Sequence, residues 1–224
     1  MGATVARLRE LRGDILIETL VGDFQGRRDP IHALVDAAPD VFAHNIEVVR
    51  SRTRAIRDAR CSYDQSLEVL RIAKRRAPER PTKSSIMVGI GERDDEVIET
   101  LRDLREAGVD IVTVGQYLRP SPKHAPVERF VTPEVFESYR EAAEALGFAY
   151  CASGPLVRSS YKAAEVFVRS MLQGDDDPAD ALDARVARAR REAARVAAEL
   201  SPAADAPAGA AGPAPGGSLL SPER

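Results

Sequence analysis

The sequence has little cysteine, no long apolar run and no large excess of charge. Its 224 residues include two cysteines, Cys61 and Cys151, too few for a disulfide framework or for a metal centre held by several thiolates. No apolar stretch approaches the roughly 20 residues that cross a bilayer, and Met1–Arg12 lacks the apolar core of a secretory signal. The net charge of −3 provides no field for holding nucleic acid or an anionic membrane. We therefore expect a cytoplasmic protein with both cysteines reduced, and a disulfide between them is the alternative.

The composition predicts a folded unit followed by a helix and a disordered tail. Hydrophobic residues make up 44% of the chain and charged residues 30%, as in globular proteins. We predict a folded unit over 1–173 and a charged Ala/Arg-rich helix within 174–200, with the helical pattern beginning at Pro178. Residues 201–224 are rich in Ala, Pro and Gly and cannot bury enough apolar surface to order themselves.

Strand-like and helix-like segments alternate along the chain from Asp14 to Phe148, which indicates an α/β fold with parallel strands. Apolar runs typical of buried parallel strands occupy Ile15–Leu20, Val41–Ile46, Ser85–Ile90, Ile111–Gly115 and Phe148–Cys151. Helical patterns occupy Thr4–Leu11, Pro30–Ala37, Glu47–Arg57, Tyr63–Arg75, Asp94–Ala107 and Pro133–Ala145. A closed eight-stranded barrel needs about 250 residues, so these strands predict part of a (β/α) TIM-type barrel. An incomplete barrel leaves two unpaired sheet edges.

The first candidate site is a glycine turn that contains Gly89 and Gly91 and is followed by Glu92. It lies at the carboxyl end of a predicted parallel strand, where α/β proteins bind ligands. Glycine lets a ligand approach the backbone closely. The acids Glu92, Asp94 and Asp95 would repel a phosphate, so they favour a ligand that offers hydroxyls, an ammonium or a sulfonium. The alternative is a tight turn with good helix capping, because short Gly-x-Gly motifs are common.

Two further polar clusters follow predicted strands. His44 can ligate a metal or transfer protons, and the neighbouring Asn45 and Glu47 can hold ribose hydroxyls or an amino group. The alternative is a strand-end histidine followed by a helix-capping asparagine. Gln116 belongs to the other cluster, Gly115–Ser121, which is either a ligand site or a polar loop that closes the barrel rim.

Ser159 and Ser160 precede a predicted helix over Tyr161–Leu172. Either side chain can cap that helix by accepting a hydrogen bond from a free backbone N–H group. A serine oxygen is a hard, poor ligand for iron beside thiolates, so it suits a metal site only where easy release is wanted. The residues alone leave both interpretations open.

The chain resembles lipoyl synthases over roughly Ile17 to Lys162. The resemblance rests on motifs in the family's order: Ile17–Leu20, Asp23–Gly26, Asp40–Glu47, Ser62–Leu67, Thr82–Ser84, Met87–Glu92, Gly115–Ser121 and Gly154–Tyr161. It implies a partial barrel that binds S-adenosylmethionine at one [4Fe–4S] cluster and generates a 5′-deoxyadenosyl radical. It also implies a second, auxiliary [4Fe–4S] cluster, which supplies sulfur to C6 and C8 of a protein-bound octanoyl chain.

The resemblance also implies roles for individual residues. By motif position, Ser159 is the oxygen ligand of the auxiliary cluster. The residues implied to line the S-adenosylmethionine side are Asn45, Glu47, Gly89, Gly91, Glu92 and Gln116. The implied partners are octanoylated lipoyl-carrier domains, such as those of 2-oxoacid dehydrogenases and the glycine cleavage H protein, and an electron donor such as ferredoxin or flavodoxin.

The cysteine motifs of the family are missing from this sequence. Family members carry a radical-site triad spaced Cys-x3-Cys-x2-Cys and a separate triad for the auxiliary cluster, and neither is present here. Positioning by the protein cannot replace a cofactor that carries the chemistry. One hypothesis is therefore a truncated form of a lipoyl synthase that is inactive alone. The alternative is a non-catalytic protein that binds S-adenosylmethionine or a carrier domain, or that completes a separately encoded N-terminal half.

Overall fold

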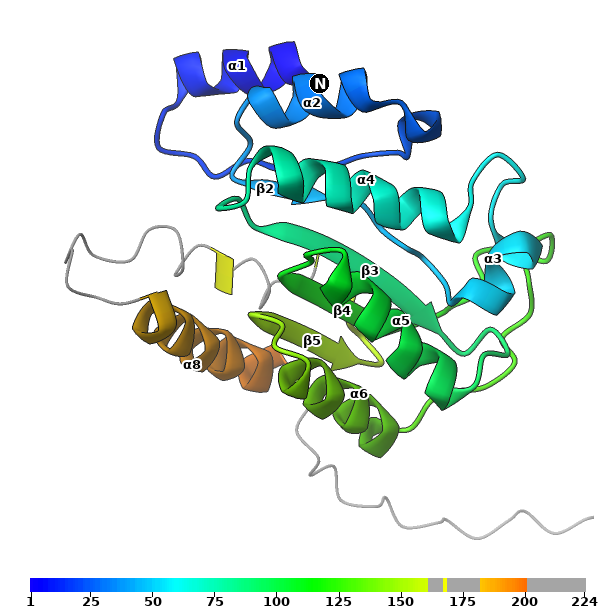
Figure 1. Cartoon of the computed structure of the whole chain (residues 1–224). Coiled ribbons are helices and arrows are strands. Elements are labelled where there is room, and N and C mark those ends of the chain that lie inside the picture. Colours follow the sequence, from blue (N-terminus) through cyan, green and yellow to red (C-terminus); the bar gives the residue numbers. More distant parts are fainter. Residues whose placement is uncertain (161–166, 169–181, 201–224) are drawn as a thin grey trace, which may run out of the picture.

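A computed structural model describes residues 1–160, 167–168 and 182–200 (Figure 1). Its five strands form one parallel sheet in chain order, β1-β2-β3-β4-β5. The strands are β1 (Glu18–Leu20), β2 (Val41–Ala43), β3 (Thr82–Val88), β4 (Ile111–Gln116) and β5 (Tyr150–Gly154). Because each strand pairs with the next along the chain, the sheet has the order of part of a (β/α) barrel. The predicted α/β class is confirmed.

Helices connect the strands. The described helices are α1 (Gly2–Leu11), α2 (Arg28–Asp36), α3 (Arg50–Ile56), α4 (Tyr63–Arg76), α5 (Asp94–Glu106), α6 (Pro133–Ala145) and α8 (Leu182–Leu200), with a 3-10 turn η1 at Phe24–Gly26. Local sequence fixes several of their starts. Ser62 caps α4 by accepting a hydrogen bond from the Gln65 N–H at 3.1 Å, and α6 has Pro133 in its first turn, where proline has no N–H to leave unpaired.

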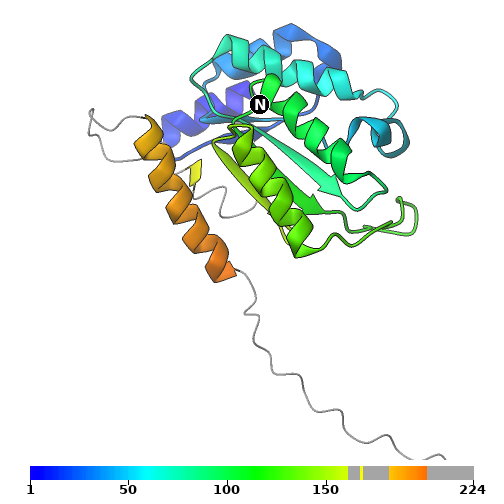
Figure 2. The same cartoon turned by 60° about the horizontal axis from the view of Figure 1, so that its bottom comes forward.

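The main core lies between the sheet and the helices α4, α5 and α6, which Figures 1 and 2 show together on one side. Ile86 and Val88 of β3 and Val112 and Val114 of β4 are buried in it. Side chains alternate between the faces of a strand, so Lys83, Ser85 and Thr113 lie on the opposite face. Burying an aliphatic side chain contributes about 1.5–3 kcal/mol each. This core therefore holds the strands in a fixed register, which positions the loops at their carboxyl ends.

Helix α8 packs on the sheet face that α4, α5 and α6 leave open. Ala189 and Ala193 of α8 share a cluster with Val41 and Ile111, which begin β2 and β4. The Arg190 guanidinium donates to the carbonyl oxygens of Ala149 at 2.8 Å and Phe148 at 2.7 Å. These contacts anchor α8 at the amino end of β5.

Several predicted boundaries were wrong by a few residues. The helix predicted from Glu47 begins at Arg50, because Glu47 instead pairs with β3 through an isolated bridge to Ile86. The last strand runs to Gly154 rather than Cys151, since Ala152, Ser153 and Gly154 pair with β4 despite their small side chains. The first strand begins only at Glu18, and the third already begins at Thr82.

Some predictions fall outside the described residues. These are the tail over 201–224 and most of the helix predicted over Tyr161–Leu172, of which Phe167 and Val168 are described and helical. Over the part of the chain that the structure covers, no helix is both long and apolar enough to cross a membrane.

Candidate functional site

The predicted polar residues gather at the carboxyl ends of three neighbouring strands. Asn45 and Glu47 follow β2, the turn from Gly89 to Glu92 follows β3, and Gln116 ends β4. These strands are adjacent and parallel, so their carboxyl ends lie at one edge of the sheet, where α/β proteins bind ligands.

The Glu92 side chain holds the glycine turn together. It is 2% exposed, and its two oxygens accept hydrogen bonds from the N–H groups of Gly89 at 2.6 Å and Ile90 at 2.9 Å. Hydrogen bonds from backbone N–H groups to a carboxylate are stronger than neutral ones. Gly89 and Gly91 have φ values of +95° and +90°, which glycine adopts without strain. The observed role of Glu92 is thus to shape the turn, and its contact with a ligand stays a prediction.

The Gln116 side chain fastens a loop to the end of β4. Its Nε2 donates to the carbonyl oxygens of Tyr117 and Arg129, each at 3.0 Å, and its Oε1 accepts from the Val131 N–H at 2.9 Å. A Cβ atom on Gly89 would lie closer than 3.0 Å to Gln116 Nε2 and to the Arg129 carbonyl oxygen. Packing inside the protein therefore explains why glycine is needed at position 89, and contact with a ligand is not required to explain it.

Asn45 and Glu47 are the predicted residues whose side chains stay available. Both are half-buried, and neither side chain makes a hydrogen bond or an ion pair with the described residues. Glu47 has a φ of +69°, a conformation that costs energy in a residue with a Cβ and is concentrated at functional sites. Its backbone is held there by hydrogen bonds to Ser85 O at 3.0 Å and from Met87 N at 2.7 Å. A carboxylate and an amide in these positions can bind an ammonium group or hydroxyls.

His44 points into the protein instead. Its Nδ1 lies 2.9 Å from the Val21 carbonyl oxygen, and its Nε2 is buried without a hydrogen-bond partner among the described residues. Burial lowers the pKa of His44, which favours the neutral form of the ring. Within the described residues, no three His, Cys, Asp or Glu side chains come together as a metal site would require. The structure therefore provides no partner ligands for His44.

The serine turn lies at the same edge of the sheet. The Arg158 side chain approaches the Gln116 carbonyl oxygen at 3.4 Å, and the Val157 backbone crosses so closely over Gly115 that a Cβ would not fit there. Ser159 follows these two residues and is half-buried. The residues after Ser160 are outside the described part, so the choice between helix cap and metal ligand stays a prediction.

The two cysteines lie in different surroundings. Cys151 is buried in the core beside α6, and burial raises its pKa to about 12. Cys61 precedes α4 and is half-buried, and its pKa is raised by burial and by the neighbouring Asp23. Both shifts disfavour the thiolate form that iron requires.

Sequence reasoning missed an ion pair on the open face of the sheet. The Lys83 side chain is 5% exposed, and its Nζ lies 3.0 and 2.8 Å from the two carboxylate oxygens of Glu18. The signal was a lysine just before a predicted buried strand, because a buried lysine needs a partner. The partner is on β1, which local sequence does not reveal.

Sequence comparison shows which known proteins this chain is similar to. The Radical SAM superfamily model matches residues 2–104. The lipoyl synthase of Sorangium cellulosum is 61% identical over 95% of this chain and 63% of its own length. The lipoyl synthase of Anaeromyxobacter dehalogenans is 53% identical over 78% of this chain, and the mitochondrial enzyme of Phytophthora infestans is 53% identical over 76%. Over these regions the chain is similar to lipoyl synthases.

The match covers only part of these relatives. The chain spans 63%, 59% and 44% of the length of the three lipoyl synthases named above. A solved structure of a radical S-adenosylmethionine methyltransferase from Kitasatospora setae aligns with a TM-score of 0.49 and 11% identity, covering 89% of this chain and 48% of the other. A likeness of that size fixes neither fold nor ligand.

Proposed function

We propose that this chain provides the S-adenosylmethionine-binding part of a lipoyl synthase, which inserts two sulfurs at C6 and C8 of a protein-bound octanoyl chain. The observation that carries the proposal is the 61% identity to a lipoyl synthase over 95% of the chain. The proposed partners are octanoylated carrier domains and a ferredoxin or flavodoxin as electron donor. The two peptide motifs at the strand ends, His44–Glu47 and Gly89–Glu92, support the placement of the site.

In this proposal, different residues bind the ligand and shape its site. The side chains of Asn45 and Glu47 have no partner among the described residues, so we assign them to the amino group or the hydroxyls of S-adenosylmethionine. Gly89 and Gly91 offer backbone groups at the same edge, and Glu92 and Gln116 keep that backbone in place. When bound, S-adenosylmethionine supplies the hydrogen-abstracting chemistry.

The iron–sulfur clusters do not fit the donors of this chain. A cubane cluster needs about three or four thiolates, whereas the chain has Cys61 and Cys151, and Cys151 lies in the helix-facing core. A single serine, Ser159, is a poor substitute. We propose that the cluster ligands come from outside these 224 residues and that the chain alone does not form lipoyl groups.

The direct test is anaerobic reconstitution of the 224-residue chain with iron, sulfide, S-adenosylmethionine, a reductant and octanoylated H protein. Mass spectrometry of the H protein should show no lipoyl product, whereas an intact lipoyl synthase run in parallel should form it. Lipoyl formation by this chain would overturn the proposal that its cluster ligands lie elsewhere.

Sequencing the genomic DNA upstream of the Met1 codon then separates the remaining hypotheses. An in-frame segment with both cysteine triads supports truncation, and a stop codon without them supports a non-catalytic binding protein.

A further inference from the structure

Arg52 of helix α3 is a cation at the ligand edge that the sequence pattern did not indicate. Its Nη2 donates a hydrogen bond to the Gly91 carbonyl oxygen. A Cβ atom on Gly91 would lie 3.0 Å from that nitrogen and 3.2 Å from Arg52 Cζ. Figures 1 and 2 both show α3 beside the carboxyl end of β3. The guanidinium therefore lies against the glycine turn that follows β3.

The charge of Arg52 is not neutralised by a carboxylate. On the same helix, Arg50 is paired with Asp64 at 2.7 Å, whereas Arg52 forms no ion pair within the described ranges. The Glu128 side chain also lies beside Gly91, with Cγ 3.4 Å from the same Cβ position. Its carboxylate nevertheless forms no ion pair with Arg52. The positive charge is therefore available to an anionic group.

Two donor nitrogens of Arg52 have no acceptor. Nε is buried and makes no hydrogen bond with any described residue. Nη1 makes none either, and it is not one of the buried unpartnered atoms, so water can reach it. A buried donor that lacks an acceptor is unfavourable. Contacts with the described part of the protein therefore do not satisfy this guanidinium, and Nη1 can donate to a ligand.

Glu47 supplies the opposite charge at the same edge. Its side chain is half-buried and has no partner among the described residues. Its backbone is hydrogen-bonded to Ser85 and Met87 of β3, and Arg52 contacts the turn at the end of that strand. A free carboxylate and a free guanidinium beside one strand end fit a ligand group that carries both charges, as an α-amino acid does.

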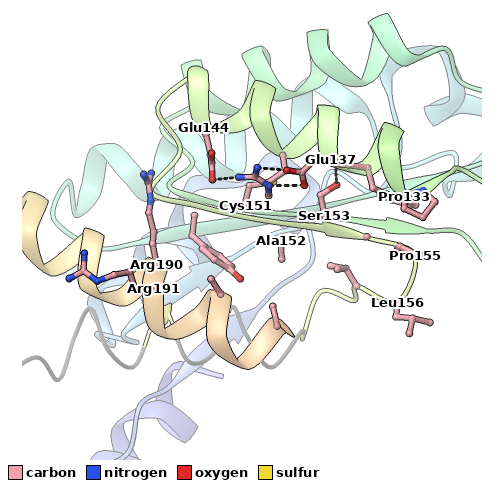
Figure 3. A pocket seen from close by; sticks show the side chains of 17 residues that line it. Pro133, Glu137, Glu144, Cys151, Ala152, Ser153, Pro155, Leu156, Arg190 and Arg191 are labelled. Carbon is pink, nitrogen blue, oxygen red and sulfur yellow. Dashed lines mark hydrogen bonds and ion pairs between the residues drawn. The ribbon is translucent and has the colours of Figure 1, made fainter. Parts of the chain in front are cut away.

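The cavity between α6 and α8 lacks such a combination. It has a volume of about 690 Å³ and opens along β5 (Figure 3). The acids that line it are Glu137 and Glu144, and Figure 3 shows both of them joined to Arg140 by ion pairs. No carboxylate there is free for an ammonium group. A ligand group with both charges is therefore matched at the strand ends and not in this cavity.

We propose that the Arg52 guanidinium binds the α-carboxylate of S-adenosylmethionine, in addition to the contacts assigned to Asn45 and Glu47. This assignment rests on the proposed function and adds a specificity-determining residue to the same site. Hydrogen bonds between a guanidinium and a carboxylate are stronger than those between neutral groups. The site should therefore prefer a ligand that has the α-carboxylate over an otherwise identical ligand without it.

Calorimetric titration of the complete 224-residue chain with S-adenosylmethionine and with its decarboxylated analogue tests the proposal. The analogue keeps the amine, the sulfonium and the nucleoside. We expect the unchanged chain to bind S-adenosylmethionine about tenfold more tightly than the analogue. Arg52→Gln should remove this preference, by weakening S-adenosylmethionine and leaving the analogue unaffected. Arg54→Gln is the matched control and should keep the preference, since Arg54 is exposed on the same helix and has no partner among the described residues.

The two ligands also separate this assignment from the proposed function. If the unchanged chain binds both equally, or if Arg52→Gln weakens both by the same factor, Arg52 does not contact the carboxylate and the assignment is wrong, while binding of S-adenosylmethionine stands. If the unchanged chain binds neither ligand, the proposed function fails together with the assignment.

A second variant serves if thermal melts show that Arg52→Gln does not fold. Arg52→Lys keeps the positive charge but loses the planar set of donors. The preference for S-adenosylmethionine over the analogue should therefore decrease several-fold without disappearing. An undiminished preference in Arg52→Lys would overturn the assignment.

Discussion

At the scale of single residues, Glu47 stands out because its backbone is strained and its side chain is free. Backbone hydrogen bonds to Ser85 and Met87 hold it at a φ of +69°, at a cost of about 1–3 kcal/mol. Other acids of the region have internal partners: Glu92 closes its own turn, and Asp94 binds Arg129 at 2.5 Å. A strained residue with a free carboxylate at the ligand edge of a sheet is the strongest candidate for substrate contact.

Glu47→Gln should therefore weaken binding of S-adenosylmethionine to the chain, by about tenfold, because a charge-assisted hydrogen bond is replaced by a neutral one. Glu99→Gln is the matched control, since Glu99 is exposed on α5 and away from the strand ends. Calorimetric titration of both variants and the unchanged chain measures the effect. Equal affinities for the Glu47 variant and the unchanged chain, or no binding by either, would count against the assigned site.

His44 makes stability depend on pH. Burial lowers its pKa in the folded state below the ordinary value of 6.5, so the unfolded chain binds a proton first as the pH falls. The neighbouring charges are Asp23, which raises the pKa, and Arg57, which lowers it. The free energy of unfolding should be unaffected by His44 above about pH 6.5 and should fall below it, by at most roughly 1.4 kcal/mol per pH unit.

Urea unfolding at pH 7.5 and pH 5.5 measures this dependence. His44→Asn keeps a side-chain donor for the Val21 carbonyl oxygen and removes the titrating ring, so its stability should fall less between the two pH values. His124→Asn is the control, because His124 lies in an exposed loop. An unchanged pH dependence in the His44 variant would show that other groups cause it.

At the scale of elements, the turn after β3 is held by contacts that reach across the fold. Gly89→Ala would place a Cβ against Gln116 and Arg129 and would also force alanine into a φ of +95°. We expect a loss of at least about 2 kcal/mol in unfolding free energy. Gly22→Ala is a suitable control, since nothing lies within 4 Å of its Cβ position. Chemical unfolding compares the two, and similar small losses would mean that the turn adjusts easily.

The same elements show how far sequence reasoning reaches. Apolar runs and helical periodicity predicted all five described strands, and α6 matches its predicted bounds, because proline marks its start. The helix start predicted at Glu47 was wrong, since Glu47 forms a bridge to Ile86, which lies 39 residues further along the chain (86 − 47). Likewise, Gln116 belongs to the predicted cluster, but its partners Arg129 and Val131 lie 13 and 15 residues further on. Local patterns predict elements, whereas long-range contacts decide which side chains stay free.

At the scale of the whole molecule, the sheet has two unpaired edges among the described strands. Helices α6 and α8 flank the β5 edge, but the β1 edge is short and carries Leu20, which is 48% exposed. An open edge with an apolar side chain is a template for pairing with another chain. The exposed β1 edge is therefore the part of the described sheet where association with another chain is expected.

The isolated chain should therefore self-associate as its concentration rises, and a charge at the β1 edge should oppose this. Leu20→Lys should shift the chain toward the monomer in sedimentation velocity. Leu11→Lys on α1 is the matched control, because Leu11 is 59% exposed but lies in a helix and not at a sheet edge. If both variants reduce association equally, general apolar contact causes it and strand pairing does not. If the unchanged chain stays monomeric at every concentration, the β1 edge is protected within the chain itself, and an incomplete barrel can be stable without a further strand.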